Sequence, residues 1–343
     1  MPCSRRRRDV SEGRRSALQH ALLAAKGHAS KRELHGVIEK LSALDRKVLM
    51  EDLEAAMLLA SAFHHLFFST RAMELLHAIE DRVTVAGDPI LLRRWRNLLA
   101  CQYFAEGDFE EAEELYSWCL SSAERSNHGR IIVAASGGLA AIRGLMGEVD
   151  VALSLYTRAL AAAHSLGMAF EIARLHHNVG LTLREWGRYT EAFPHFMHAA
   201  DYYAENGILE EKVFSSAERS LLLTATGDTL MAEQLARTAQ ERCKVLRNPT
   251  IEVTALRAMG VVLRATGRLE EARANLIEAV RLAEGCSHAL VRVDAYEEMA
   301  LVEAMNGHGA SAEYFRNRAV DTFGHLGLHK HCERFLSNYN SAL

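Results

Sequence analysis

A 40-residue spacing of glycine and alanine constrains the fold of this 343-residue chain more than any other sequence feature. Six glycines recur at this spacing, each followed five residues later by an alanine: Gly107, Gly147, Gly187, Gly227, Gly267 and Gly307, with Ala112, Ala152, Ala192, Ala232, Ala272 and Ala312. Glycine permits the positive φ of a sharp turn, and alanine lets two helices approach closely. Repetition at this period therefore predicts a solenoid whose units are helix pairs divided at the glycine.

A further, divergent unit is expected before the first glycine. Counting back 40 residues from Ala112 reaches Ala72, and Phe67 takes the place of the turn glycine.

Two departures interrupt the later units: Arg219–Ser220 replaces a pair of large and small apolar residues, and Pro194 falls inside an expected helix. Because proline removes a backbone hydrogen bond, we expect a bend at Pro194.

The composition predicts an all-α protein that has no membrane partner. The chain has only 4 prolines, and 49% of its residues are hydrophobic. No apolar run approaches the roughly 20 residues that span a bilayer. The six cysteines are widely separated, which is typical of a reducing compartment. Because the N-terminal stretch also lacks the apolar core of a secretory signal, we expect a cytoplasmic location.

The charge gives no general drive toward nucleic acid, because the formal net charge is -4. The basic run Arg5–Arg8 is interpreted as part of a solvated tail. Contact with nucleic acid through this run is the alternative.

Four segments share a pattern of small and large residues: "GDFEEAEELYSWCL", "GEVDVALSLYTRAL", "GRYTEAFPHFMHAA" and "GRLEEARANLIEAV". They resemble the second-helix motif of tetratricopeptide repeats (TPRs). This resemblance covers about residues 51–326 and implies a right-handed α-solenoid, or superhelix, of about seven helix-turn-helix units. The 40-residue period resembles the longer repeats of kinesin light chains and of the sensor regions of LuxR-type activators, the maltotriose activator among them.

Four segments follow from this interpretation. We expect a basic, flexible N-terminal segment at 1–30, a capping helix at 31–50, the TPR solenoid at 51–326 and a C-terminal capping helix at 327–343. The caps are expected because the ends of a solenoid need a polar face to cover the last apolar surface.

No catalytic motif is present, so neither an enzymatic activity nor a cofactor is expected. The chain has no phosphate-binding loop, no H-E-x-x-H zinc motif and no G-x-S-x-G elbow. A metal-dependent enzyme remains an alternative because His325, His329, His331 and Cys332 are close in sequence. Gly327 is expected to divide them between two helices, so we predict no metal site.

The resemblance to TPR proteins implies that the first helix of each unit lines a concave face that binds a peptide or protein. Aligning the units in register gives ten candidate binding residues. They are Asn97, Phe104, Gly137, Gly138, Arg174, His177, Asn178, Arg184, Arg257 and Arg264.

Two chemical arguments accompany this list. Small residues such as Gly137 and Gly138 leave room in a groove, and arginines bind an acidic segment or a C-terminal carboxylate in bidentate fashion. Each argument has an alternative. The glycines would equally serve close helix packing, and Arg174 and Arg184 would pair with neighbouring glutamates such as Glu171 and Glu185.

The leading hypothesis is a non-enzymatic scaffold or adaptor that binds a protein or peptide on its concave face. The alternative is a ligand- or peptide-sensing module of a bacterial signalling or transcriptional regulator. The sequence identifies neither the partner nor the oligomeric state, and homo-oligomerisation stays open.

Overall fold

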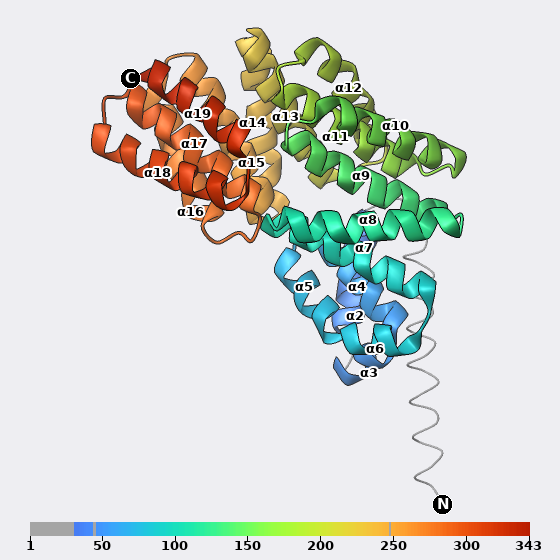
Figure 1. Ribbon diagram of the computed structural model, residues 1–343. Helices are drawn as coiled ribbons and strands as arrows, with labels where there is room; N and C mark the ends of the chain where they lie inside the picture. The colour runs from blue at the N-terminus through green and yellow to red at the C-terminus, as the bar shows by residue number, and fades with distance from the viewer. Residues whose placement is uncertain (1–30, 44–45, 247) are drawn as a thin grey trace, which may run out of the picture. The chain divides into compact units, whose positions relative to one another are not determined.

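The computed structural model describes residues 31–43, 46–246 and 248–343 (Figure 1), and the Arg5–Arg8 run lies outside them. These residues form eighteen α-helices and no strand, which confirms the all-α prediction. None of the described helices is long and apolar enough to cross a membrane. Two compact units divide between Gln102 and Tyr103, within α7 (Pro89–Glu106).

The first unit contains the divergent helix pair. Its helices are α2 (Lys31–Ser42), α3 (Arg46–Glu51), α4 (Leu53–His65), α5 (Ser69–Ala78), α6 (Glu80–Ala86) and the first part of α7. Helix α4 packs against α2 and α5. Between α4 and α5, Phe67 has a φ of 60° and so adopts the left-handed conformation expected of the glycine that it replaces. α2 and α3 occupy the segment expected to cap the solenoid.

The second unit is a solenoid of consecutive helix pairs. Its helices after α7 are α8 (Phe109–Arg125), α9 (Gly129–Leu145), α10 (Val149–Ser165), α11 (Ala169–Glu185), α12 (Tyr189–Glu205), α13 (Leu209–Thr226), α14 (Thr229–Leu246), α15 (Pro249–Ala265), α16 (Leu269–Ala283), α17 (Ala289–Met305), α18 (Gly309–His325) and α19 (His329–Ala342). Each odd-numbered helix from α9 to α17 packs on the even-numbered helix that follows it and on the next odd-numbered helix. The pairs therefore stack along the chain as predicted (Figure 1).

The repeated small residues occupy the closest helix contacts. All twelve are fully buried: Ala112, Cys119, Ala152, Ala159, Ala192, Ala199, Ala232, Ala239, Ala272, Ala279, Ala312 and Ala319. The turn glycines have positive φ, for example 76° at Gly187. A second left-handed position, 20 residues further on, ends the second helix of several units, as at Gly167 and Gly207. Sequence analysis did not identify this second position.

Both departures from the repeat pattern are accommodated. The Ser220 hydroxyl donates a hydrogen bond of 2.8 Å to the buried Ala232 carbonyl, so a small polar residue replaces the small apolar one at this helix contact. Pro194 lies inside α12, which continues from Tyr189 to Glu205.

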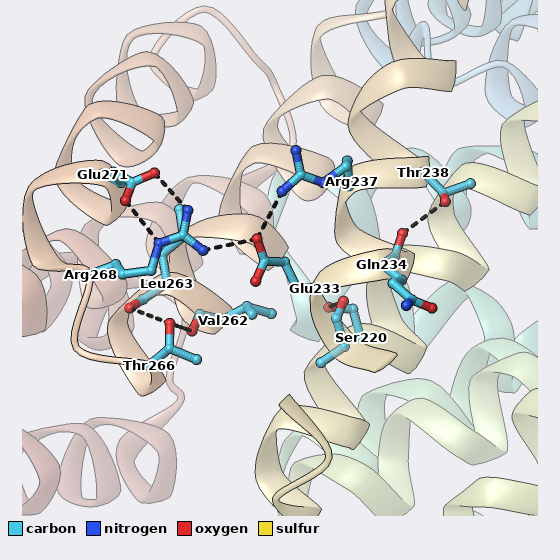
Figure 2. A network of polar contacts seen from close by, with 11 residues as sticks. Ser220, Glu233, Gln234, Arg237, Thr238, Val262, Leu263, Thr266, Arg268 and Glu271 are labelled. Atoms are coloured by element: carbon cyan, nitrogen blue, oxygen red, sulfur yellow. Dashed lines mark hydrogen bonds and ion pairs between the residues drawn. The ribbon is translucent and has the colours of Figure 1, made fainter. Parts of the chain in front are cut away.

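Exposed ion pairs link neighbouring units at their turns (Figure 2). Arg268 follows a turn glycine and donates to Glu271 at 2.7 and 2.8 Å, and to Glu233 of the preceding unit at 2.9 Å. Arg188 holds the same position two units earlier and contacts Glu191 at 2.7 Å. These contacts stay in solvent, so each stabilises the solenoid only slightly.

Candidate functional site

The second unit contains a cavity of about 540 Å³, open to solvent on one side, between the first helices of four successive pairs and the C-terminal helix α19. The lining residues are Arg184, Glu185, Trp186, Gly187, Tyr189, Leu221, Thr224, Ala225, Arg257, Val261, Arg264, Ala265, Asp294, Glu297, Glu298, Arg334 and Asn338. They come chiefly from α11, α13, α15, α17 and α19. The first helices thus line a hollow, and α19 supplies a further wall.

Three of the predicted arginines meet in this cavity, and each is paired with a carboxylate. Arg184 lies 3.0 Å from Glu218 of α13, and Arg264 lies 3.0 Å from Glu298. Arg257 is 9% exposed and forms an ion pair with Asp294. These arginines therefore form ion pairs with acidic residues, which is the alternative that the sequence left open. Most of the acidic partners belong to neighbouring units.

The C-terminal helix is tied to the cavity wall by Arg334. Its guanidinium donates hydrogen bonds to the backbone carbonyl and to the carboxylate of Glu185, and it lies 5.7 Å from the centre of the Trp186 ring. His331 packs edge-on against Trp186 with ring centres 5.2 Å apart. Trp186 in turn donates a hydrogen bond of 2.7 Å to the Gly144 carbonyl, so α19 is anchored to two earlier units.

Residues spaced four apart at the C-terminal end contact successive turns. Leu326 lies against Gly107, Lys330 against Gly147, and Arg334 against Glu185. Leu326 follows α18, whereas Lys330 and Arg334 lie one turn apart on α19. The C-terminal segment therefore bridges units that are far apart in sequence, rather than covering only the last pair as expected of a cap.

Two glutamates in the cavity have opposite pKa shifts. Burial alone would raise the pKa of Glu185, but Arg184, Arg334 and His331 hold it at about 2. The pKa of Glu297 rises to about 7 because burial disfavours its charge and because Glu298 and Glu185 are negative neighbours. Glu297 is thus the carboxyl whose charge this cavity compensates least.

The predicted glycines do not provide room. A Cβ atom added to Gly137 would lie 3.0 Å from Cδ2 of Leu175, and one added to Gly138 would overlap the Tyr116 ring. Large neighbouring side chains fill the space that the glycines leave. Close packing, the alternative left open by the sequence, accounts for both residues, and the expectation of a roomy groove beside them was wrong.

The remaining predicted residues lie away from the cavity lining. Arg174 pairs with Glu171 at 2.7 Å, and Asn178 is half-buried on α11. His177 is buried between Phe196 and Phe214, and burial lowers its pKa. Asn97 is buried in the first unit, and Phe104 packs against Phe109 with ring centres 5.4 Å apart. The binding role of these five residues stays a prediction.

The histidines and the cysteine near the C-terminus do not converge. His331 is buried against Trp186 and Phe323, whereas His325 lines a separate hollow beside Gly107. Within the described part of the chain, no group of three histidine, cysteine or acidic side chains is arranged to hold a metal ion.

Sequence reasoning missed Arg334 and Glu297. The sequence did contain a signal for Glu297. It lies 40 residues after Arg257 and 80 after Ala217, and so occupies the same repeat position as Arg257, which was predicted to face the binding surface. Arg334 gave none, since its partner Glu185 is 149 residues away.

Comparisons with known proteins identify the repeat. A family model described as tetratricopeptide repeat matches residues 131–205, which span α9 to α12. Residues 131–205 carry tetratricopeptide repeats. No sequence among curated proteins matches the chain significantly.

Solved TPR-like structures share the fold at low identity. A Rap protein complexed with competence and sporulation factor is 14% identical, has a TM-score of 0.65 and aligns over 85% of each chain. NprR in complex with its cognate peptide NprX is 14% identical, with a TM-score of 0.58 over 85% of this chain and 82% of NprR. The Cut9–Hcn1 structure is 13% identical, with a TM-score of 0.54 over 96% of this chain and 63% of the other. Such identities indicate a common fold and not a common function.

Proposed function

We propose that this TPR protein is a non-enzymatic, cytoplasmic binding module whose second unit takes a short peptide into the cavity between α11, α13, α15, α17 and α19. The observation that carries the proposal is the cavity itself. Its volume of about 540 Å³ lies within the usual range of roughly 300–1,000 Å³ for ligand sites. A peptide of a few residues suits that volume. The charged side chains on several of the lining helices offer it polar contacts.

The similar structures support the peptide as guest. The Rap protein was determined in complex with competence and sporulation factor, and NprR in complex with its cognate peptide NprX. Each aligns with 85% of this chain.

A sensor is the second candidate function, and the contact between Arg334 and Glu185 favours it. Glu185 lines the cavity, while α19 packs on α17 and α18. A guest that competes for Glu185 would release Arg334 and so change how α19 is held. Binding would then be transmitted to the C-terminal end of the chain, as a regulator requires. NprR is described as a quorum sensor from B. thuringiensis.

The test is peptide retention by the purified chain. An equimolar library of synthetic pentapeptides is mixed with the protein, free peptide is removed by gel filtration, and retained peptides are identified by mass spectrometry. We expect a small set of sequences to be retained. Ala225 is exposed within the cavity, so Ala225→Trp should fill the space and reduce retention at least tenfold.

A matched control separates cavity filling from general damage. Ala161→Trp makes the same change on the exposed outer side of α10 and should leave retention unchanged. Circular dichroism should show equal helix content in all three proteins. Retention of no peptide by the wild-type chain, or equal retention by Ala225→Trp, would refute the proposal.

A further inference from the structure

One carboxylate of the cavity lining has no paired cation. Four arginines and four carboxylates line the cavity: Arg184, Arg257, Arg264 and Arg334 with Glu185, Asp294, Glu297 and Glu298. The buried Glu218 does not line it but contacts Arg184 and Arg257. Every one of the arginines already has a carboxylate partner. Among the described residues, Glu297 has no hydrogen-bond or ion-pair partner of its own. Each arginine of the lining is thus engaged by another carboxylate, and Glu297 is left as the lining acid without a paired cation.

We infer that the guest of this cavity places a cationic group, a protonated amine or a guanidinium, against the carboxylate of Glu297. The inference rests on the proposed function and adds the chemistry of the ligand to it. A half-buried carboxylate without a partner is costly, because burial removes part of its hydration. A cation from the ligand would replace that hydration with a charge-assisted hydrogen bond.

The same inventory argues against the acidic partner expected from the arginines alone. A ligand carboxylate would have to share an arginine that already has a carboxylate partner, for example Arg264, which lies 3.0 Å from Glu298. It would add a further negative charge to the cavity that holds Glu297. Because like charges in a partly desolvated site repel, such a guest gains less than a cationic one.

The surroundings of Glu297 add to its demand for a cation. Glu298 of the same helix and Glu185 of α11 are negative neighbours, and Arg257 and Arg334 lie at distances that only partly offset them. These influences, with burial, raise its pKa to about 7, so near neutral pH the carboxyl is only partly ionised. A bound cation favours the ionised form, and binding at pH 7 should therefore release a proton to the buffer.

The test compares two pentapeptide libraries of matched shape. The cationic library has free amino termini, lysine and arginine. In the cation-free library the amino termini are acetylated, acetyl-lysine and citrulline replace lysine and arginine, and histidine is omitted. We expect the wild-type chain to retain peptides from the cationic library at least tenfold more than their cation-free counterparts.

Variants locate the effect at one carboxyl. Glu297→Gln should lose this preference, whereas Glu313→Gln, the same change at an exposed position of α18, should keep it. Titration calorimetry of one retained peptide in buffers of different ionisation enthalpy should show proton release with wild type and none with Glu297→Gln.

The outcomes distinguish this inference from the proposed function. Equal retention of both libraries by the wild-type chain overturns the inference and leaves peptide binding intact. Retention from neither library overturns both. Cationic preference that persists in Glu297→Gln, with helix content equal to wild type, also overturns the inference. The library comparison uses the wild-type chain alone and so does not depend on the folding of a variant.

Discussion

At its C-terminal end helix α11 contributes Arg184 and Glu185 to the cavity, whereas near its middle His176 lies in a cluster of histidines. The His176 ring is 4.1 Å from that of His198 and 5.0 Å from that of His195, centre to centre. Nδ1 of His176 lies 2.8 Å from Nδ1 of His195, so one ring donates and the other accepts. Both regions bring ionisable groups together on one helix.

The two regions meet the cost of desolvation in opposite ways. In the cavity, Glu185 stays charged because guanidinium groups surround it, and its pKa falls to about 2. At His176 burial and the neighbouring histidines lower the pKa to about 4 and keep the ring neutral at pH 7, whereas Glu191 partly offsets the lowered pKa of His195. The fold should therefore be destabilised at the cavity when a charged partner is removed, and at the histidine cluster when His176 is protonated.

Removing Glu218 should give the largest effect. Its side chain is 4% exposed and lies 3.0 Å from Arg184 and 3.8 Å from Arg257, so Glu218→Ala leaves two arginines short of a counter-charge. We expect a loss of about 3 kcal/mol in the free energy of unfolding, measured by urea titration. Glu278→Ala, which breaks an exposed pair with Arg281, is the control and should change little. Equal losses in the two variants would show that burial does not set the energy of the cavity pairs.

Acid should act on the histidine cluster. The unfolded chain protonates His176 near pH 6.5 but the folded chain only near pH 4, so stability from its neutrality is lost as pH falls through this range. His176→Phe cannot gain this proton and should lose about 1 kcal/mol less than wild type between pH 7 and 4.5. Urea midpoints at the two pH values measure the difference. Identical losses would mean that His176 does not titrate in this way.

Glu297 should show the reverse dependence on pH. Its folded pKa of about 7 exceeds the ordinary value of 4.5, so the folded state is penalised as pH rises between them and the penalty is complete above pH 7. Glu297→Gln, neutral at every pH, should stabilise the chain by about 1 kcal/mol at pH 8 and have little effect at pH 4. Thermal unfolding at both pH values measures this, and a destabilised variant at pH 8 would reveal a partner for the carboxylate.

An ion pair outside both regions should matter least. Arg268→Ala removes exposed contacts with Glu233 and Glu271 (Figure 2), so we expect only a small fall in melting temperature that disappears in 1 M salt. A fall as large as that of Glu218→Ala, or one unaffected by salt, would show that these turns hold the solenoid together.

Sequence periodicity predicted most of the fold and part of the site. The spacing of small residues predicted the helix pairs, and Phe67 was placed correctly at a turn without glycine. Four arginines from first helices were predicted to share a face. Arg184, Arg257 and Arg264 line one cavity, and Arg174 lies outside its lining. The glycines of α9 were misassigned as a groove because the sequence does not show which neighbour, here Tyr116 or Leu175, fills the space beside a missing side chain.

The sequence by itself determined the repeat, because turn conformation and close helix contact are local demands that recur wherever the same residue stands at the same offset. Only the tertiary structure decided what the charged residues do. Whether Arg334 meets Glu185, and whether Glu297 is left without a cation, depends on the curvature accumulated over several helix pairs, which brings residues 149 positions apart into contact. Ion pairing is set by distance and burial, and neither is encoded in the register of a single repeat.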